Sequence, residues 1–187
     1  MPNIPIATGM RAVIAVLAAC TVFGCAGAIT SDAPLLNSRN ASFPLPRHAQ
    51  LEASTLHDDV WQRDERKGRI DLVDGAYRVT GPDEPTPSPE RYLFKQVDRG
   101  EFVVQGRNDD AWAYGLIVRE DRYYLFTFNR TGENCTSLSA LEQSDLHMTV
   151  RDDRCYVANL PDLIGLLHHM RKKFPHPTSA FTVSGGE

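Results

Sequence analysis

The sequence lacks the short motifs that mark common enzyme families. Its 187 residues contain no G-x-S-x-G nucleophile elbow, no H-E-x-x-H zinc motif, no phosphate-binding P-loop and no G-x-G-x-x-G dinucleotide fingerprint. None of its serines falls in a segment that predicts the strand-to-helix turn of a nucleophilic serine. The sequence therefore predicts no catalytic residue and no cofactor. An enzyme built from scattered residues stays open, but a non-enzymatic role is favoured.

The chain also lacks an excess of charge of one sign. Its net charge is −4, and basic residues alternate with acidic ones, as in RDERKGR at 63–69. Proteins that bind nucleic acid usually carry a contiguous basic patch that neutralises phosphates. This composition excludes nucleic acid as a predicted partner.

Cysteine is scarce, with four residues in the chain, and no C-x-x-C redox motif occurs. Cys135 and Cys155 are the pair outside the amino-terminal segment, and an even pair in an exported protein predicts a disulfide. A metal site would need more ligands close by, and His147 is the one plausible addition, so no metal site is predicted. The bridge would stabilise the fold by about 3 kcal/mol, given the loop that it closes.

No apolar run is long enough to span a bilayer as a permanent helix. Arg11 is the single charge before Asp32, and it precedes the short apolar run AVIAVLAACTVFGC at 12–25. This pattern is typical of a targeting segment that is removed from the mature protein. We therefore exclude residues 1–24 from the fold and assign them as a signal peptide.

The end of this segment, Val-Phe-Gly-Cys at 22–25, resembles the lipobox of bacterial lipoproteins. The resemblance covers about the first 25 residues. It implies that Cys25 is acylated, becomes the first mature residue and anchors the protein in a membrane. Leu-Ala-Ala-Cys at 17–20 makes Cys20 the alternative, but its apolar core would be very short, so spacing favours Cys25. Ala26 follows the cysteine, which in this family implies an outer-membrane location facing the periplasm.

The segments that flank the predicted domain have weak patterns. Residues 25–53 are rich in Ala, Ser, Asn and Pro without a sustained period, which predicts a flexible tether. Residues 54–68 are compatible with a helix capped by Ser54 or Thr55 and ended by Gly68. Residues 81–89 contain four prolines and predict an exposed loop, and residues 176–187 are expected to be a disordered tail.

Residues 92–129 form the most informative stretch of the chain. Four runs rich in β-branched and aromatic residues are separated by charged or glycine-containing turns, which predicts an antiparallel meander. Even positions from Trp112 to Val118 share one face, whereas Ile117, Tyr123 and Leu125 lie on the other. Because both faces are apolar, we expect each to be covered, by a helix on one side or by curling of the sheet towards a barrel.

Further hairpins are predicted at 69–80, around Asp74 and Gly75, and at 147–156. Asn159 and Pro161 predict the start of a helix whose apolar stripe consists of Leu160, Leu163, Ile164, Leu167 and Phe174. The predicted fold class is therefore α+β. A single domain over 54–175 would contain an antiparallel meander of about six strands, a packed carboxy-terminal amphipathic helix and one disulfide.

His57, beside Asp58 and Asp59, and the pair His168 and His169 are the first candidates for a reactive centre, but their pattern does not predict one. His168 and His169 are adjacent on the predicted helix and point about 100° apart, so they do not easily serve one site. We expect a non-enzymatic, membrane-anchored envelope lipoprotein facing the periplasm, which acts through contacts with envelope proteins or the envelope itself. The alternative is a small β-barrel-like carrier of a lipid or another hydrophobic ligand. A filled interior favours the first function, and an apolar void favours the second.

Overall fold

The structure is a computed structural model that describes residues 28–57, 60–81, 90–108, 111–130 and 133–185. Most of these residues belong to β-strands, with one long helix near the carboxy terminus. The strands are β1 (Ile29–Ser31), β2 (His48–His57), β3 (Val60–Val73), β4 (Ala76–Thr80), β5 (Leu93–Asp98), β6 (Glu101–Asn108), β7 (Ala111–Arg119), β8 (Tyr123–Phe126), β9 (Asn129–Arg130), β10 (Glu133–Asn134), β11 (Thr149–Arg151), β12 (Arg154–Tyr156) and β13 (Ser179–Ser184). The helices are η1 (Cys135–Ser137), α2 (Ala140–Asp145) and α3 (Leu160–Lys173).

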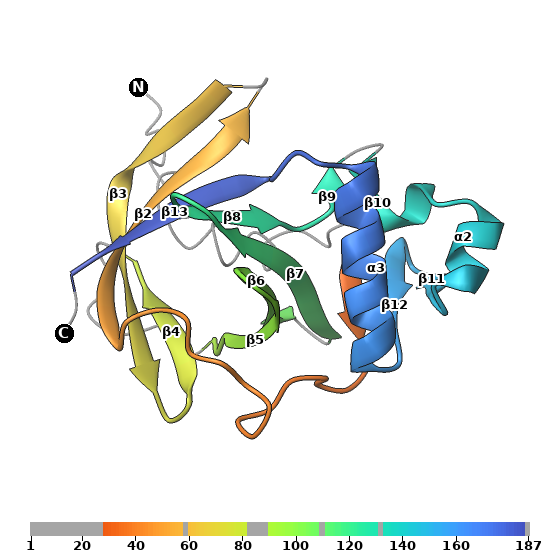
Figure 1. The fold of residues 1–187 in the computed structure, drawn as a ribbon, viewed down its shortest axis with the longest axis horizontal. Helices are drawn as coiled ribbons and strands as arrows, with labels where there is room; N and C mark the ends of the chain where they lie inside the picture. Colours follow the sequence, from red (N-terminus) through yellow and green to blue (C-terminus); the bar gives the residue numbers. More distant parts are fainter. Residues whose placement is uncertain (1–27, 58–59, 82–89, 109–110, 131–132, 186–187) are drawn as a thin grey trace, which may run out of the picture.

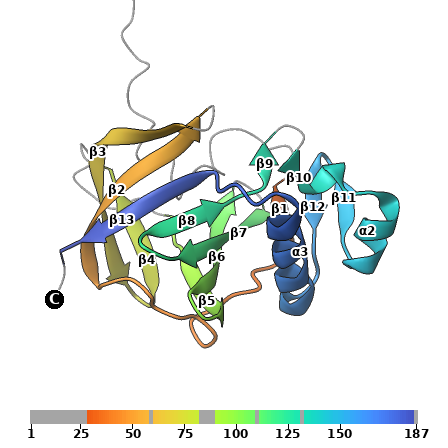
Figure 2. The same cartoon turned by 45° about the horizontal axis from the view of Figure 1, so that its top comes forward.

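Eight of the strands form a closed ring (Figures 1 and 2). Strands β2, β3 and β4 pair in sequence, as do β5, β6, β7 and β8, and β13 joins β8 to β2. The ring closes between β4 and β5 through Tyr77 and Tyr92, whose backbones exchange hydrogen bonds of 2.9 and 2.8 Å. This single bridge joins the two groups of strands and closes the ring.

The meander predicted for 92–129 is confirmed as strands β5 to β8, and the mostly β fold with a carboxy-terminal helix and a disulfide is also present. The prediction of about six antiparallel strands was wrong. The main sheet has eleven strands and is mixed, because β1 pairs in parallel with β12 and antiparallel with β7. The additional strands come mainly from segments that we expected to be tether, helix and tail.

Residues 48–57 and 60–73 form the long antiparallel pair of strands β2 and β3, so the prediction of a helix over 54–68 was wrong. Ala49, Leu51 and Ala53 are buried and alternate with more exposed polar residues, which is the period of a strand with one buried face. Two of these three buried residues are alanines, which carry a weak apolar signal. The period therefore escaped detection in the sequence.

The tether expected for 25–53 is wrong over its described part, residues 28–53. Ile29 in β1 is fully buried, and residues 32–47, which we call the strap, run from β1 to β2 across the ring. Buried Gln105 binds the strap at Leu36, accepting from its N–H at 2.7 Å and donating to its carbonyl at 3.1 Å. These backbone groups are satisfied by distant side chains, so the segment is ordered without a regular pattern of its own.

The expected disordered tail is also wrong within its described residues. Residues 179–184 form β13, which pairs with β2 along its whole length and with β8 over three residues. Phe181 is 1% exposed and lies inside the ring. The folded unit therefore extends beyond the predicted 54–175 in both directions.

The inside of the ring is filled by side chains from all eight strands and from the strap. Many are aromatic, and Gly106 leaves room for one of them, since a Cβ there would lie 2.9 Å from the ring of Tyr92. We call this set the interior cluster: Leu45, Ala49, Leu51, Ala53, Ile70, Tyr77, Val79, Tyr92, Phe94, Phe102, Val104, Ile117, Tyr123, Leu125 and Phe181.

The outer cluster lies on the outside of β6, β7 and β8, where α3 packs (Figure 2). Strands β1 and β12, which continue the same sheet beside β7, also contribute to it. Helix α3 contributes four fully buried residues, of which Leu166 and Met170 were missing from the predicted stripe. The outer cluster is Ile29, Leu36, Val103, Tyr114, Leu116, Val118, Phe126, Phe128, Cys135, Leu138, Met148, Cys155, Val157, Leu163, Leu166, Leu167 and Met170. Both covers expected for the meander are therefore present, a helix outside and a curled sheet inside.

Local signals place the turns and the start of α3 as predicted. Asp74 and Gly75 both have positive φ angles, 51° and 70°, in the tight β3–β4 turn. The side chain of Asn159 accepts a hydrogen bond of 3.0 Å from the N–H of Asp162 and caps α3. Arg171, Lys172 and Lys173 end the helix, where their charge complements the dipole.

Candidate functional site

The predicted lipidation residue, Cys25, and its alternative, Cys20, lie outside the described residues. The folded chain begins very close to Cys25, because Ala28 is 2% exposed and accepts a hydrogen bond of 2.9 Å from the N–H of Cys155. Three residue steps of extended chain span at most about 11 Å. A lipid on Cys25 would therefore be held within that distance of the folded domain.

The predicted disulfide between Cys135 and Cys155 is confirmed, with the two Cα atoms 6.1 Å apart. Both cysteines are fully buried in the outer cluster, where the bridge connects η1 to β12. The bridge therefore holds the cover of the outer cluster together, beside the point where the amino-terminal segment enters the fold.

The histidines inspected as candidate catalytic residues are not brought together. His147 pairs with Asp162 at 3.1 Å, His168 with Glu101 at 3.0 Å and His169 with Glu142 at 3.1 Å. Each histidine therefore has a different carboxylate partner. Glu101 also pairs with Arg171, and Glu142 also pairs with Lys173. His57 ends β2, and its side chain lies outside the described residues.

Within the described ranges, no three His, Cys, Asp or Glu side chains are grouped so that they could hold a metal ion. In the same ranges, no helix has the length and apolar character needed to cross a membrane.

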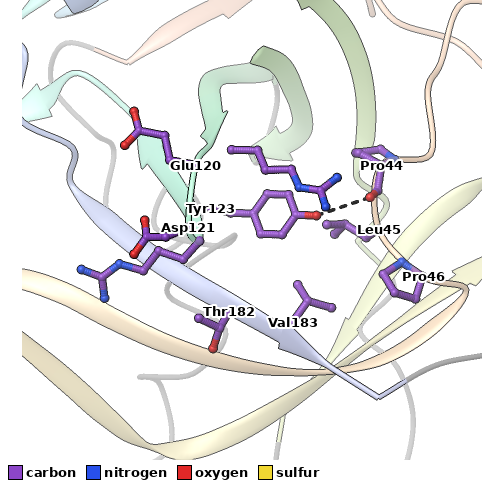
Figure 3. Close-up of a pocket in the computed structure, with 10 residues that line it drawn as sticks. Pro44, Leu45, Pro46, Glu120, Asp121, Tyr123, Thr182 and Val183 are labelled. Atoms are coloured by element: carbon purple, nitrogen blue, oxygen red, sulfur yellow. Dashed lines mark hydrogen bonds between the residues drawn. The ribbon is translucent and has the colours of Figure 1, made fainter. Parts of the chain in front are cut away.

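A pocket of about 490 Å³ lies at one end of the ring (Figure 3). Three separate segments line it, namely the strap, the β7–β8 hairpin and the end of β13. We call this site the mouth pocket, and its lining residues are Pro44, Leu45, Pro46, Arg119, Glu120, Asp121, Arg122, Tyr123, Thr182 and Val183.

Leu45 and Tyr123 line the mouth pocket and also belong to the interior cluster, so the pocket lies directly against that cluster. The backbone of Leu45 is fixed by Tyr77, whose hydroxyl accepts from its N–H at 3.0 Å and donates to its carbonyl at 2.5 Å. The ring of Tyr123 stacks on Phe181 with 5.0 Å between centroids, and its hydroxyl donates to the Pro44 carbonyl at 3.4 Å. Burial raises the pKa of Tyr123, although Arg119 opposes the shift, so the hydroxyl keeps its proton.

The charged residues of the mouth pocket have unequal surroundings. Arg122 lies 4.8 Å from the ring centroid of Trp61 and donates to the hydroxyl of Tyr124 at 3.2 Å. Asp121 accepts from the same hydroxyl at 2.9 Å, which lowers its pKa. The guanidinium of Arg119 lies 5.6 Å from the ring centroid of Tyr123, and no ion pair joins it to any described carboxylate.

The sequence did not predict the mouth pocket. The stretch VREDRYY at 118–124 contains one of the charged turns that the sequence predicts between strands of the meander. The other two walls are far away in the sequence, in segments expected to be a tether and a tail, so their meeting could not be predicted. The one available signal was the pair of prolines that flank Leu45, because proline restricts the backbone and suits a rigid wall.

No protein-family model matches this chain, and no curated protein or solved structure shows significant similarity to it.

Proposed function

We propose that the protein is a non-enzymatic lipoprotein of the bacterial envelope, anchored through Cys25 and facing the periplasm, which acts through contacts with envelope proteins or the envelope. The observation that carries this proposal is the buried Cys135–Cys155 disulfide downstream of a lipobox-like sequence. Disulfides persist in oxidising compartments such as the periplasm. Two independent features of the chain thus support export.

The start of the fold adds a geometric condition to this proposal. Because Ala28 is buried, the anchored domain would stay close to the membrane surface and would not extend from it on a long tether. Partners reached by such a domain would be membrane proteins or lipids beside it, since its range is about 11 Å from Cys25 to Ala28. Ala26 supports the outer membrane as the location, through the family resemblance.

Metabolic labelling with an alkyne-bearing fatty acid tests the anchor. Cys25→Ser should abolish the label and release the protein from the membrane fraction. Cys20→Ser is the matched control and should keep both the label and the membrane location. Label that persists in Cys25→Ser and disappears in Cys20→Ser would move the anchor to Cys20, and no label in the unaltered protein would refute lipidation.

Histidine variants test whether the role is non-enzymatic. His147→Ala, His168→Ala and His169→Ala remove surface ion pairs of the kind that contribute about 0 to 1 kcal/mol, so each should fold and complement a deletion strain. A variant that folds, keeps its anchor and still fails to complement would favour an enzyme.

The alternative function, a carrier of a lipid or another hydrophobic ligand, draws support from the closed ring of strands. The side chains that fill the ring weigh against it, because Tyr77, Phe94 and Phe181 are each at most 1% exposed. Mass spectrometry of organic extracts from the purified protein separates the two functions. A stoichiometric apolar molecule, beyond the anchor itself, would favour the carrier.

A further inference from the structure

We propose that the mouth pocket binds a small amphipathic anion, with the acidic group on Arg119 and the apolar part against the strap. This site is separate from the lipid anchor and does not depend on it. The chemical class follows from the apolar wall, the cation and the size of the pocket.

The wall of the mouth pocket is apolar and rigid. Pro44, Leu45 and Pro46 line one side and Val183 lines another. The two prolines restrict the backbone. The hydroxyl of Tyr77 bonds to the backbone of Leu45, and the hydroxyl of Tyr123 bonds to the carbonyl of Pro44, so this part of the strap is fixed. A wall that is already ordered loses little entropy on binding, so even a small apolar group gains from contact with it.

Arg119 supplies the charge that selects an anion. Its guanidinium lies 5.6 Å from the ring centroid of Tyr123, and the hydroxyl at the far end of that ring reaches Pro44 at 3.4 Å. One tyrosine side chain thus connects the cation to the apolar wall. No carboxylate in the described part of the chain pairs with this guanidinium, so its donors suit a carboxylate, sulfonate or phosphate.

The two acidic residues of the mouth pocket do not prevent an anion from binding at Arg119. Figure 3 shows Glu120 and Asp121 on the side of Tyr123 opposite to Pro44 and Pro46. Asp121 is engaged with the hydroxyl of Tyr124. An anion that lies between Arg119 and the strap is therefore farther from these carboxylates than from the guanidinium.

The size of the pocket limits the ligand. About 490 Å³ is in the range of ordinary small-molecule sites. Leu45 is 5% exposed and packs into a ring that the interior cluster already fills. The ligand would therefore be a short molecule that stays at the mouth and not a long acyl chain threaded into the interior.

The test uses the full chain in phosphatidylcholine nanodiscs and measures binding of 4-phenylbutyrate by calorimetry, with 4-phenylbutan-1-ol as the neutral control. The acid should bind more tightly than the alcohol. Arg119→Gln should weaken the acid by about tenfold or more and leave the alcohol unchanged, because one charge-assisted contact is lost. Arg39→Gln, at an exposed arginine elsewhere in the strap, should change neither.

A second variant tests the apolar wall without altering Arg119. Val183→Glu places a carboxylate at a partly exposed wall position, so it should weaken binding of 4-phenylbutyrate more than binding of the neutral 4-phenylbutan-1-ol. Circular dichroism confirms folding of each variant. The proposal is overturned if the unaltered protein binds acid and alcohol equally, if it binds neither, or if Arg119→Gln and Arg39→Gln have equal effects.

Discussion

The interior and outer clusters are similar in burial but differ in how the chain assembles them. The interior cluster is built mainly from hairpins between strands that follow one another, and only β13 comes from far away in the sequence. The outer cluster joins β1, the disulfide segment and α3 onto β7, and Thr30 bonds to Cys155 across 125 positions. The interior therefore depends on packing between neighbours, whereas the outer cluster depends on a few long-range connections.

The largest effect is expected when the interior cluster loses an aromatic ring. Phe181→Ala removes a ring that stacks on Tyr123, and it should lower the free energy of unfolding by about 3 to 5 kcal/mol. Urea denaturation followed by circular dichroism measures this change. Leu166→Ala, at a fully buried position of α3, is the counterpart in the outer cluster, with an expected loss of about 2 to 5 kcal/mol. A loss below 1 kcal/mol for Phe181→Ala would contradict a filled interior.

Removal of the disulfide should destabilise the outer cluster more than the interior cluster. Replacing Cys135 and Cys155 together by alanine should cost about 3 kcal/mol, because the unfolded chain loses a constraint across 20 positions. Hydrogen exchange should increase in β1, η1 and β12, while β5 and β6 stay protected. Equal loss of protection in both groups would mean that the two clusters unfold as one unit.

A smaller effect is expected at the contact between the strap and the ring. Tyr77→Phe leaves the N–H and carbonyl of buried Leu45 without their partner, and it should cost about 1 to 3 kcal/mol. The measurement is the denaturation midpoint. Tyr156→Phe, at a partly exposed tyrosine of β12, is the control and should leave the midpoint nearly unchanged.

The smallest effect is a pH dependence at the edge of the outer cluster. A hydrogen bond from Lys173, with further ones from Ser139 and His169, lowers the pKa of Glu142 from 4.5 to about 2. A carboxylate with a lowered pKa stabilises the fold above its unfolded pKa, and this contribution is lost as the pH falls from 4.5 through 2. Glu142→Gln should therefore flatten the acid side of the stability profile, whereas Glu120→Gln should not. Identical profiles for Glu142→Gln and the unaltered protein would contradict the predicted role of this carboxylate.

Local chemistry in the sequence predicted the parts of the fold that depend on neighbours. The meander, the turn at Asp74 and Gly75, the start of α3 at Asn159 and the Cys135–Cys155 pair all have short-range or compositional signals. Each such signal reflects a backbone or redox requirement that a few residues satisfy by themselves. The predicted number of strands was too low because it was based on these signals alone.

The remaining parts depend on contacts that no short window contains. The strap is held by Gln105, Tyr114 and Tyr77, which reach its backbone across at least 32 positions. The mouth pocket likewise combines Pro44, Arg119 and Val183 from three separate segments. A sequence window shows polar turns and prolines at these places, and only the closed ring brings them together.

Strand β1 affects the order in which the protein can be assembled. It is the first described strand to leave the ribosome, but it pairs with residues 112–114 of β7 and with 155–156 of β12. The slot between β7 and β12 does not exist until most of the chain has been synthesised. Strand β1 must therefore stay unpaired until β7 and β12 have both been synthesised. Under the proposed anchoring at Cys25, the acylating enzyme would therefore meet a chain whose first described strand has not yet entered the fold.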